Sequence, residues 1–272
     1  MLYKFILSLF FIVSVESSLL AQDSLLSSCP GNVKEMNRYD FSQLLHESGL
    51  LVVRPIKWKG GDWIKFGVAA AVTFSLMQED QRIRTIALNN PKYSQSLPME
   101  VGNQWGGFYF GPILALSLYT TGILAKSYKT KKIGFEIAQG ILYSEAVSFV
   151  SKGCISRSRP FTDQGASDYH PFSFFDSPHN SFPAGHVDAA VALSTVLSKN
   201  ANSGFLKVIA YVPAALTVTS RIIQDEHWAS DVFIGGVIGY FVGKWVVNRH
   251  EIKESRVQVV SIYPFSLKFV IN

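Results

Sequence analysis

Residues 101–125 read VGNQWGGFYFGPILALSLYTTGILA, a run of 25 residues without a charged side chain. A helix needs about 20 mostly apolar residues to cross a bilayer, so this run can span a membrane or fill the core of a bundle. Apolar segments with helical character occur at 62–78, 106–125, 133–151, 186–198, 204–220 and 230–247. They predict an all-α fold, a helical bundle of about six helices.

The end of the chain has a different pattern. Apolar residues recur at every second position from Phe265 to Ile271, which is the period of a β-strand. We therefore expect a short strand-like tail within 251–272. Between Glu79 and Gln104 the chain is polar, and residues 80–84, of which three are charged, predict the start of a solvated helix with no chemical role.

Membrane contact is favoured by composition, because hydrophobic residues make up 48% of the chain and charged residues only 17%. The other helical segments, however, contain charges such as Lys65, Glu136 and Lys244, or are short for a span. Two arrangements remain open. Either short helices cross a membrane around a protein-lined site, or the bundle is largely water-soluble with one or two strongly buried helices.

The N-terminus has the pattern of a secretory signal. Lys4 precedes an uncharged apolar run from Phe5 to Val15, and Ala21 lies at a suitable cleavage point. We predict a signal peptide at 1–21, a leader segment at 22–61, a helical domain at 62–250 and a tail at 251–272. The protein is expected on the periplasmic or extracytoplasmic side.

The chain has 2 cysteines, Cys29 and Cys154, and an exported protein can either pair them or keep them as thiols. Lipid attachment at Cys29 is not expected, because Gln22 and Asp23 interrupt the apolar run that should lead into it. The net charge of +5 suits acidic partners such as phosphorylated lipids. Clustered Lys and Arg interleaved with aromatics are lacking, so nucleic acid is not an expected partner.

Three short blocks at predicted helix ends concentrate cations, histidines and glycine. Lys152, Arg159 and Arg221 supply positive charge for the oxygens of a transferring phosphoryl group. Arginine binds two oxygens with a planar fork, whereas lysine acts as a point charge, so the mixture suits a tetrahedral anion.

Two of the blocks contain the histidines. Gly185 and His186 open an apolar helix, where backbone N–H groups bind anions and His186 can protonate a departing oxygen. His227 and Asp231 are four positions apart, which on a helix puts them on one face. Asp231 is expected to hold one ring N–H of His227 and leave the other nitrogen free to attack phosphorus.

Together the blocks resemble the signature of the type 2 phosphatidic acid phosphatase and vanadium haloperoxidase superfamily. That pattern is Lys, six residues, Arg-Pro; then Pro-Ser-Gly-His; then Ser-Arg, five residues, His, three residues, Asp. This chain matches it at 152–160, 183–186 and 220–231 with one exception, Ala184, where the family usually has serine. The missing hydroxyl removes one donor, worth about 0.5 to 1.5 kcal/mol, while the Ala184 N–H is expected to remain for the phosphate.

The resemblance implies a role for each matched residue. The implied catalytic residues are His227 as nucleophile, Asp231 as its partner and His186 as acid. The implied phosphate-binding residues are Lys152, Arg159, Ala184, Gly185, Ser220 and Arg221. The expected reaction is hydrolysis of a phosphomonoester or pyrophosphate through a phosphohistidine, with no metal and no cofactor.

Several alternatives remain open at this stage. A vanadate-dependent haloperoxidase would use the same residues, and a phosphate-binding membrane protein could have lost turnover through changes such as Ala184. The substrate is expected to be a phosphorylated lipid, or else a small phosphomonoester. Residues 161–180 should form the mouth of the site, where their aromatic side chains either contact a lipid tail or pack the loop.

Overall fold

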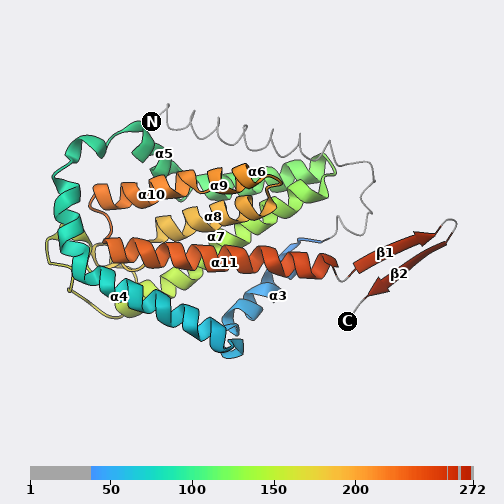
Figure 1. Ribbon diagram of the computed structural model, residues 1–272, viewed down its shortest axis with the longest axis horizontal. Helices are drawn as coiled ribbons and strands as arrows, with labels where there is room; N and C mark the ends of the chain where they lie inside the picture. The colour runs from blue at the N-terminus through green and yellow to red at the C-terminus, as the bar shows by residue number, and fades with distance from the viewer. Residues whose placement is uncertain (1–37, 256, 263–264, 271–272) are drawn as a thin grey trace.

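The computed structural model describes residues 38–255, 257–262 and 265–270. Its α-helices are α3 (Phe41–Val52), α4 (Gly60–Leu88), α5 (Leu97–Trp105), α6 (Phe110–Leu124), α7 (Tyr128–Ile155), α8 (Gly185–Asn200), α9 (Gly204–Ile209), α10 (Val212–Ile223) and α11 (Ala229–Ser255). Strands β1 (Val257–Ile262) and β2 (Phe265–Val270) follow as an antiparallel pair (Figure 1). The predicted signal peptide at 1–21, the leader up to residue 37 and Cys29 lie outside the described residues.

The predicted helical class is confirmed, since every element between residues 41 and 255 is helical. The prediction of about six helices is wrong, because the described part of the chain contains more. Two of the additional helices, α3 with 12 residues and α5 with 9, are short and lie in segments that we expected to be polar. The segment predicted at 204–220 is divided into α9 and α10, with Pro213 in the first turn of α10.

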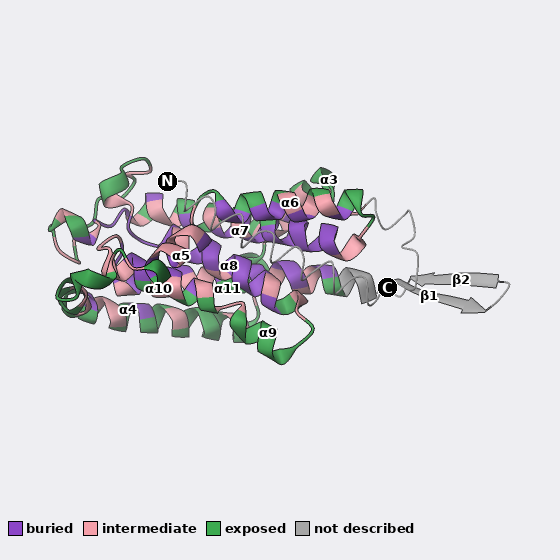
Figure 2. Cartoon of the chain, turned by 90° about the horizontal axis from the view of Figure 1, so that it is seen from above, coloured by how far each residue is buried: buried purple, intermediate pink, exposed green. Residues whose placement is uncertain are grey.

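Helix α8 lies at the centre of the bundle and packs against α7, α10 and α11. Leu193 of α8 joins Ile137 of α7 and Leu118 of α6 in the main hydrophobic cluster, and all three are fully buried. Figure 2 shows the buried residues concentrated along α7 and α8, with exposed residues on the outer helices. The core therefore holds the ends of α7 and α8 in fixed positions.

The contact between α8 and α11 depends on glycine. A Cβ atom at Gly239 would lie 2.3 Å from the carbonyl oxygen of Asp188, and one at Gly235 would lie 2.6 Å from that of Ala184. Real Cβ atoms do not approach backbone this closely, so only glycine permits the two helices to be this near. This packing brings the start of α11 against the start of α8.

Candidate active site

The three sequence blocks meet at one end of the bundle, at the left in Figure 1. Lys152 lies in the last turn of α7, and Arg159 follows in the loop after it. Gly185 and His186 open α8, while Ser220 and Arg221 close α10. His227 precedes α11 and Asp231 lies in its first turn. The helix termini thus assemble residues that are up to 79 positions apart, from Lys152 to Asp231.

His227 is buried and is oriented by the backbone. Its Nδ1 lies 2.8 Å from the carbonyl oxygen of Ser181, which can only accept, so Nδ1 must carry the proton. The Nε2 atom of the neutral ring therefore holds the lone pair. Burial, followed by the positive charges of Arg159 and Lys152, keeps the pKa of His227 well below its usual range. The ring is therefore uncharged at neutral pH, as a nitrogen nucleophile requires.

Asp231 does not hold His227 directly, contrary to the prediction from their spacing. Its carboxylate accepts from the Ser181 hydroxyl at 2.5 Å, the Trp228 N–H at 3.0 Å and the Arg157 guanidinium at 2.7 Å. The Ser181 hydroxyl lies 3.4 Å from His227 Nδ1. The expectation fails because His227 lies before the first residue of α11, so the geometry of a helical turn does not apply to this pair. Asp231 is therefore linked to His227 through Ser181, which contacts both residues.

Arg157 is a site residue that the sequence analysis missed. Its guanidinium is fully buried, donating to Asp231 at 2.7 Å and to Asp80 of α4 at 2.8 Å. Asp80 also accepts from the backbone N–H and hydroxyl of Ser230. The prediction that residues 80–84 form a solvated helix without a role is therefore wrong for Asp80, which is 1% exposed. The sequence shows Arg157 only as one more arginine within the first block, because its partner Asp80 lies 77 positions away.

The three predicted cations have different partners. Lys152 donates to the carbonyl oxygens of Pro183 at 2.6 Å and Asn180 at 3.1 Å, and burial with the nearby Arg159 charge lowers its pKa to about 8. Arg159 forms an ion pair with Glu226 at 2.6 Å. Arg221 donates to Asn103 of α5 and to Gln224. Only one of the three, Arg159, has a carboxylate partner among the described residues, so substantial positive potential remains at the site.

His186 lies in the first turn of α8, among these cations. Burial and the charges of Arg221, Arg159 and Lys152 lower its pKa to about 4. The ring is therefore neutral when no anion is bound. A bound phosphate would offset the surrounding positive charge and favour protonation of His186.

The remaining predicted phosphate-binding residues differ from expectation in one case. The Ala184 N–H donates to the carbonyl oxygen of Asp231 at 3.1 Å. This N–H is thus already paired, contrary to the prediction that it binds phosphate. Gly185 begins α8, and the first N–H groups of a helix have no partner within it. The Ser220 hydroxyl donates to Thr217 at 2.8 Å, and its role in binding stays a prediction.

The loop from 161 to 180 lies next to this set, since the Arg159 N–H donates to Pro178. Its aromatic residues Phe172 and Phe175 are strongly exposed, whereas Phe174 packs on Phe149 of α7. The packing role is thus confirmed for Phe174, and Phe175 also contacts Phe149. Contact of these side chains with a lipid tail stays a prediction. Cys154, just before the loop, is exposed.

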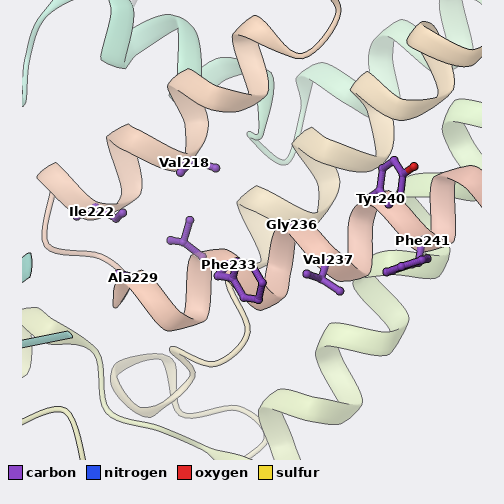
Figure 3. A pocket seen from close by; sticks show the side chains of 9 residues that line it. Val218, Ile222, Ala229, Phe233, Gly236, Val237, Tyr240 and Phe241 are labelled. Carbon is purple, nitrogen blue, oxygen red and sulfur yellow. The ribbon is translucent and has the colours of Figure 1, made fainter. Parts of the chain in front are cut away.

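An apolar groove of about 440 Å³ runs between α10 and α11 and begins beside the site. Figure 3 shows its side chains along both helices. It is lined by Val218, Ile222, Ala229, Val232, Phe233, Gly236, Val237, Tyr240 and Phe241. Val232, which directly follows Asp231, connects the groove to the polar site.

Comparisons with known proteins agree with this picture. Residues 134–254 match the model of the PAP2 superfamily. A stretch of 67 residues is 40% identical to a lipid A 1-phosphatase of Porphyromonas gingivalis, covering 24% of this chain and only 15% of that protein.

Two solved structures are also similar. A transmembrane PAP2-type phosphatidylglycerolphosphate phosphatase from Bacillus subtilis has a TM-score of 0.55 and 20% identity, over 70% of this chain and 94% of that chain. LpxE from Aquifex aeolicus has a TM-score of 0.45 and 20% identity, over 62% and 94% of the two chains. The likeness to the Bacillus subtilis structure shows a shared fold.

Proposed function

We propose that this protein is a membrane phosphatase that removes phosphate from a phosphorylated lipid, because residues 134–254 match the PAP2 superfamily model. The observation that carries the proposal is the setting of His227. Its Nδ1 proton is fixed by the Ser181 carbonyl, and its Nε2 lone pair is free beside Lys152, Arg159 and Arg221.

The reaction follows from these positions in two steps. The Nε2 atom attacks phosphorus, the bond from phosphorus to the ester oxygen breaks, and protonated His186 gives its proton to that oxygen. Water then attacks the phosphohistidine, the P–N bond breaks, and His186 takes the proton from water. The cations stabilise charge on the equatorial oxygens in both steps. Asp231 holds Ser181, and thereby His227, in place.

A lipid substrate is supported by the groove between α10 and α11. Its lining is almost entirely aliphatic and aromatic, which suits an acyl chain and offers little to a sugar or nucleotide. The related proteins are named for lipid A and phosphatidylglycerol phosphate, both of which are phosphorylated lipids. The groove would hold a chain while the headgroup phosphate reaches His227.

A membrane location is supported by helix length and apolarity. Among the described residues, two stretches are long and apolar enough to cross a bilayer, Gly204–Ile223 and Ala229–Glu251. The bent pair formed by α5 and α6 would make a third. Together with the predicted signal sequence, this favours a site on the extracytoplasmic side.

The test is phosphate release from lipid A 1-phosphate, phosphatidylglycerol phosphate and a soluble aryl phosphate, using the detergent-solubilised full chain. His227→Ala should lower turnover of every accepted substrate at least about a thousandfold, because the nucleophile is lost. His46→Ala, at an exposed position on α3, serves as the matched control and should be unchanged. Near-parental turnover in a folded His227→Ala protein would contradict the mechanism. Preference for the aryl phosphate over both lipids would contradict the lipid assignment.

A further inference from the structure

A second cluster of ionisable side chains lies in the loop after α7. One ligand-type atom from each of Asp168, His170 and His179 falls within 4.8 Å of the others. The His170 Nε2 atom is 2.7 Å from the Asp168 carboxylate, and the two imidazole rings are 4.0 Å apart between centroids. Imidazole nitrogens and a carboxylate oxygen that converge in this way can share one cation.

We propose that Asp168, His170 and His179 bind a zinc ion. Two imidazole nitrogens and a carboxylate oxygen are donors that zinc accepts, and three protein ligands leave a fourth position. A purely oxygen-bound cation such as Mg²⁺ or Ca²⁺ fits poorly, because these prefer carboxylates, carbonyls and water.

The groups around His179 support the assignment. Its Nδ1 atom lies 2.8 Å from the Asp176 carboxylate, which fixes the proton on Nδ1 and leaves Nε2 as a ligand. That Nε2 atom is 3.2 Å from the Gln164 amide oxygen. A neutral imidazole cannot donate to both acceptors at once. With zinc on Nε2, the Nδ1 proton serves Asp176 and the Gln164 oxygen is placed as the fourth ligand.

The site would fasten the loop to the segment that carries the arginines. The Asp168 carboxylate accepts from the Ser158 hydroxyl, and the Ser158 N–H donates to the Asp168 carbonyl at 3.0 Å. The His170 N–H donates to Ser156 at 2.7 Å. Ser158 lies between Arg157 and Arg159, so an ion held here would stabilise the backbone that presents them. The site takes no part in phosphoryl transfer, and it does not depend on the proposed function.

The experiment uses the tag-free full chain in detergent, treated with EDTA and then dialysed. Calorimetric titration with zinc chloride should show about one ion bound per chain, and the ion should raise the midpoint of thermal unfolding. His170→Ala and His179→Ala should each weaken binding at least tenfold and remove that rise. Asp176→Asn should weaken it by about 10- to 100-fold, as expected for a residue that orients a ligand. His46→Ala should behave as the parent.

A cobalt titration provides an independent readout. Co²⁺ in place of zinc should give visible absorption of a four-coordinate site in the parent, and this should be lost in His179→Ala. Two outcomes would overturn the proposal: no saturable zinc binding by the folded parent, or equal binding by the folded double variant of His170 and His179. The second outcome would show that any bound ion lies elsewhere.

Discussion

The protonation state of Lys152 connects the site to pH. Its ammonium group touches two carbonyl oxygens and no carboxylate is within ion-pair distance among the described residues, so burial lowers its pKa to about 8. The lowered value means that the cation is present below about pH 8 and is lost as pH rises through it. Phosphate affinity should follow, because only the protonated form attracts the anion.

We therefore predict that KM for a phosphate ester rises about tenfold per pH unit above pH 8, whereas Lys152→Arg removes this rise, since a guanidinium stays charged. The variant should have a higher KM at pH 7, because the planar group does not replace the ammonium contacts exactly. Steady-state kinetics from pH 7 to 10 provide the measurement. An equal rise in both proteins would show that another group titrates.

The positions of candidate site residues were predictable where the members of a motif are close together in the sequence. Lys152, His186 and His227 could be identified from spacing, because each block keeps its members within one helix end. Asp80 could not be identified, because its partner Arg157 is reached only through the packing of α4 across the site. The direct contact between Asp231 and His227 was predicted wrongly, because the start of α11 could not be located to within two residues.

At the scale of elements, the close contact of α8 and α11 sets the distance between the start of α8 and His227, the proposed nucleophile. The helices themselves were predictable from apolar periodicity, whereas the contact was not. Gly67 of α4 is also a glycine within an apolar helical segment, as Gly235 and Gly239 are. A Cβ atom at Gly67, however, would meet nothing within 4 Å. Only the fold shows which glycines face another backbone.

This difference yields a matched pair of variants. Gly239→Ala should force α8 and α11 apart and lower stability by about 1 to 3 kcal/mol, with a loss of kcat, because the added methyl meets the Asp188 carbonyl. Gly67→Ala should leave activity unchanged and slightly raise stability, since alanine favours a helix. Thermal unfolding and turnover of both proteins provide the comparison. Equal behaviour of the two would contradict the close-contact argument.

At the scale of the whole molecule, large apolar side chains cover much of the outer surface. Exposed examples are Phe66 and Phe74 of α4, Leu116 of α6 and Phe241 of α11. A bilayer would cover such side chains on helices that cross it. The composition favoured membrane contact, but charged residues such as Glu136 argued against membrane-spanning helices. The sequence does not show that Glu136 is buried against Asn200 and His250.

We predict that the protein remains in the membrane fraction after extraction with alkaline carbonate and is released only by detergent. The physical reason is that the two candidate spans would each lose an apolar environment on release. Immunoblots of the extracted and pelleted fractions make the measurement. Quantitative release by carbonate would favour a peripheral association instead.

The ion pairs of Arg157 with Asp80 and Asp231 also restrict how this protein can change over time. Replacing Arg157 leaves two buried carboxylates uncompensated, at a cost of about 3 to 5 kcal/mol, whereas replacing Asp80 leaves Arg157 paired with Asp231. A substitution at Arg157 is thus tolerated more readily if Asp80 changes with it. Among homologous sequences, the identities at positions 80 and 157 should covary, so an aspartate on a distant helix becomes a marker for which relatives keep this architecture.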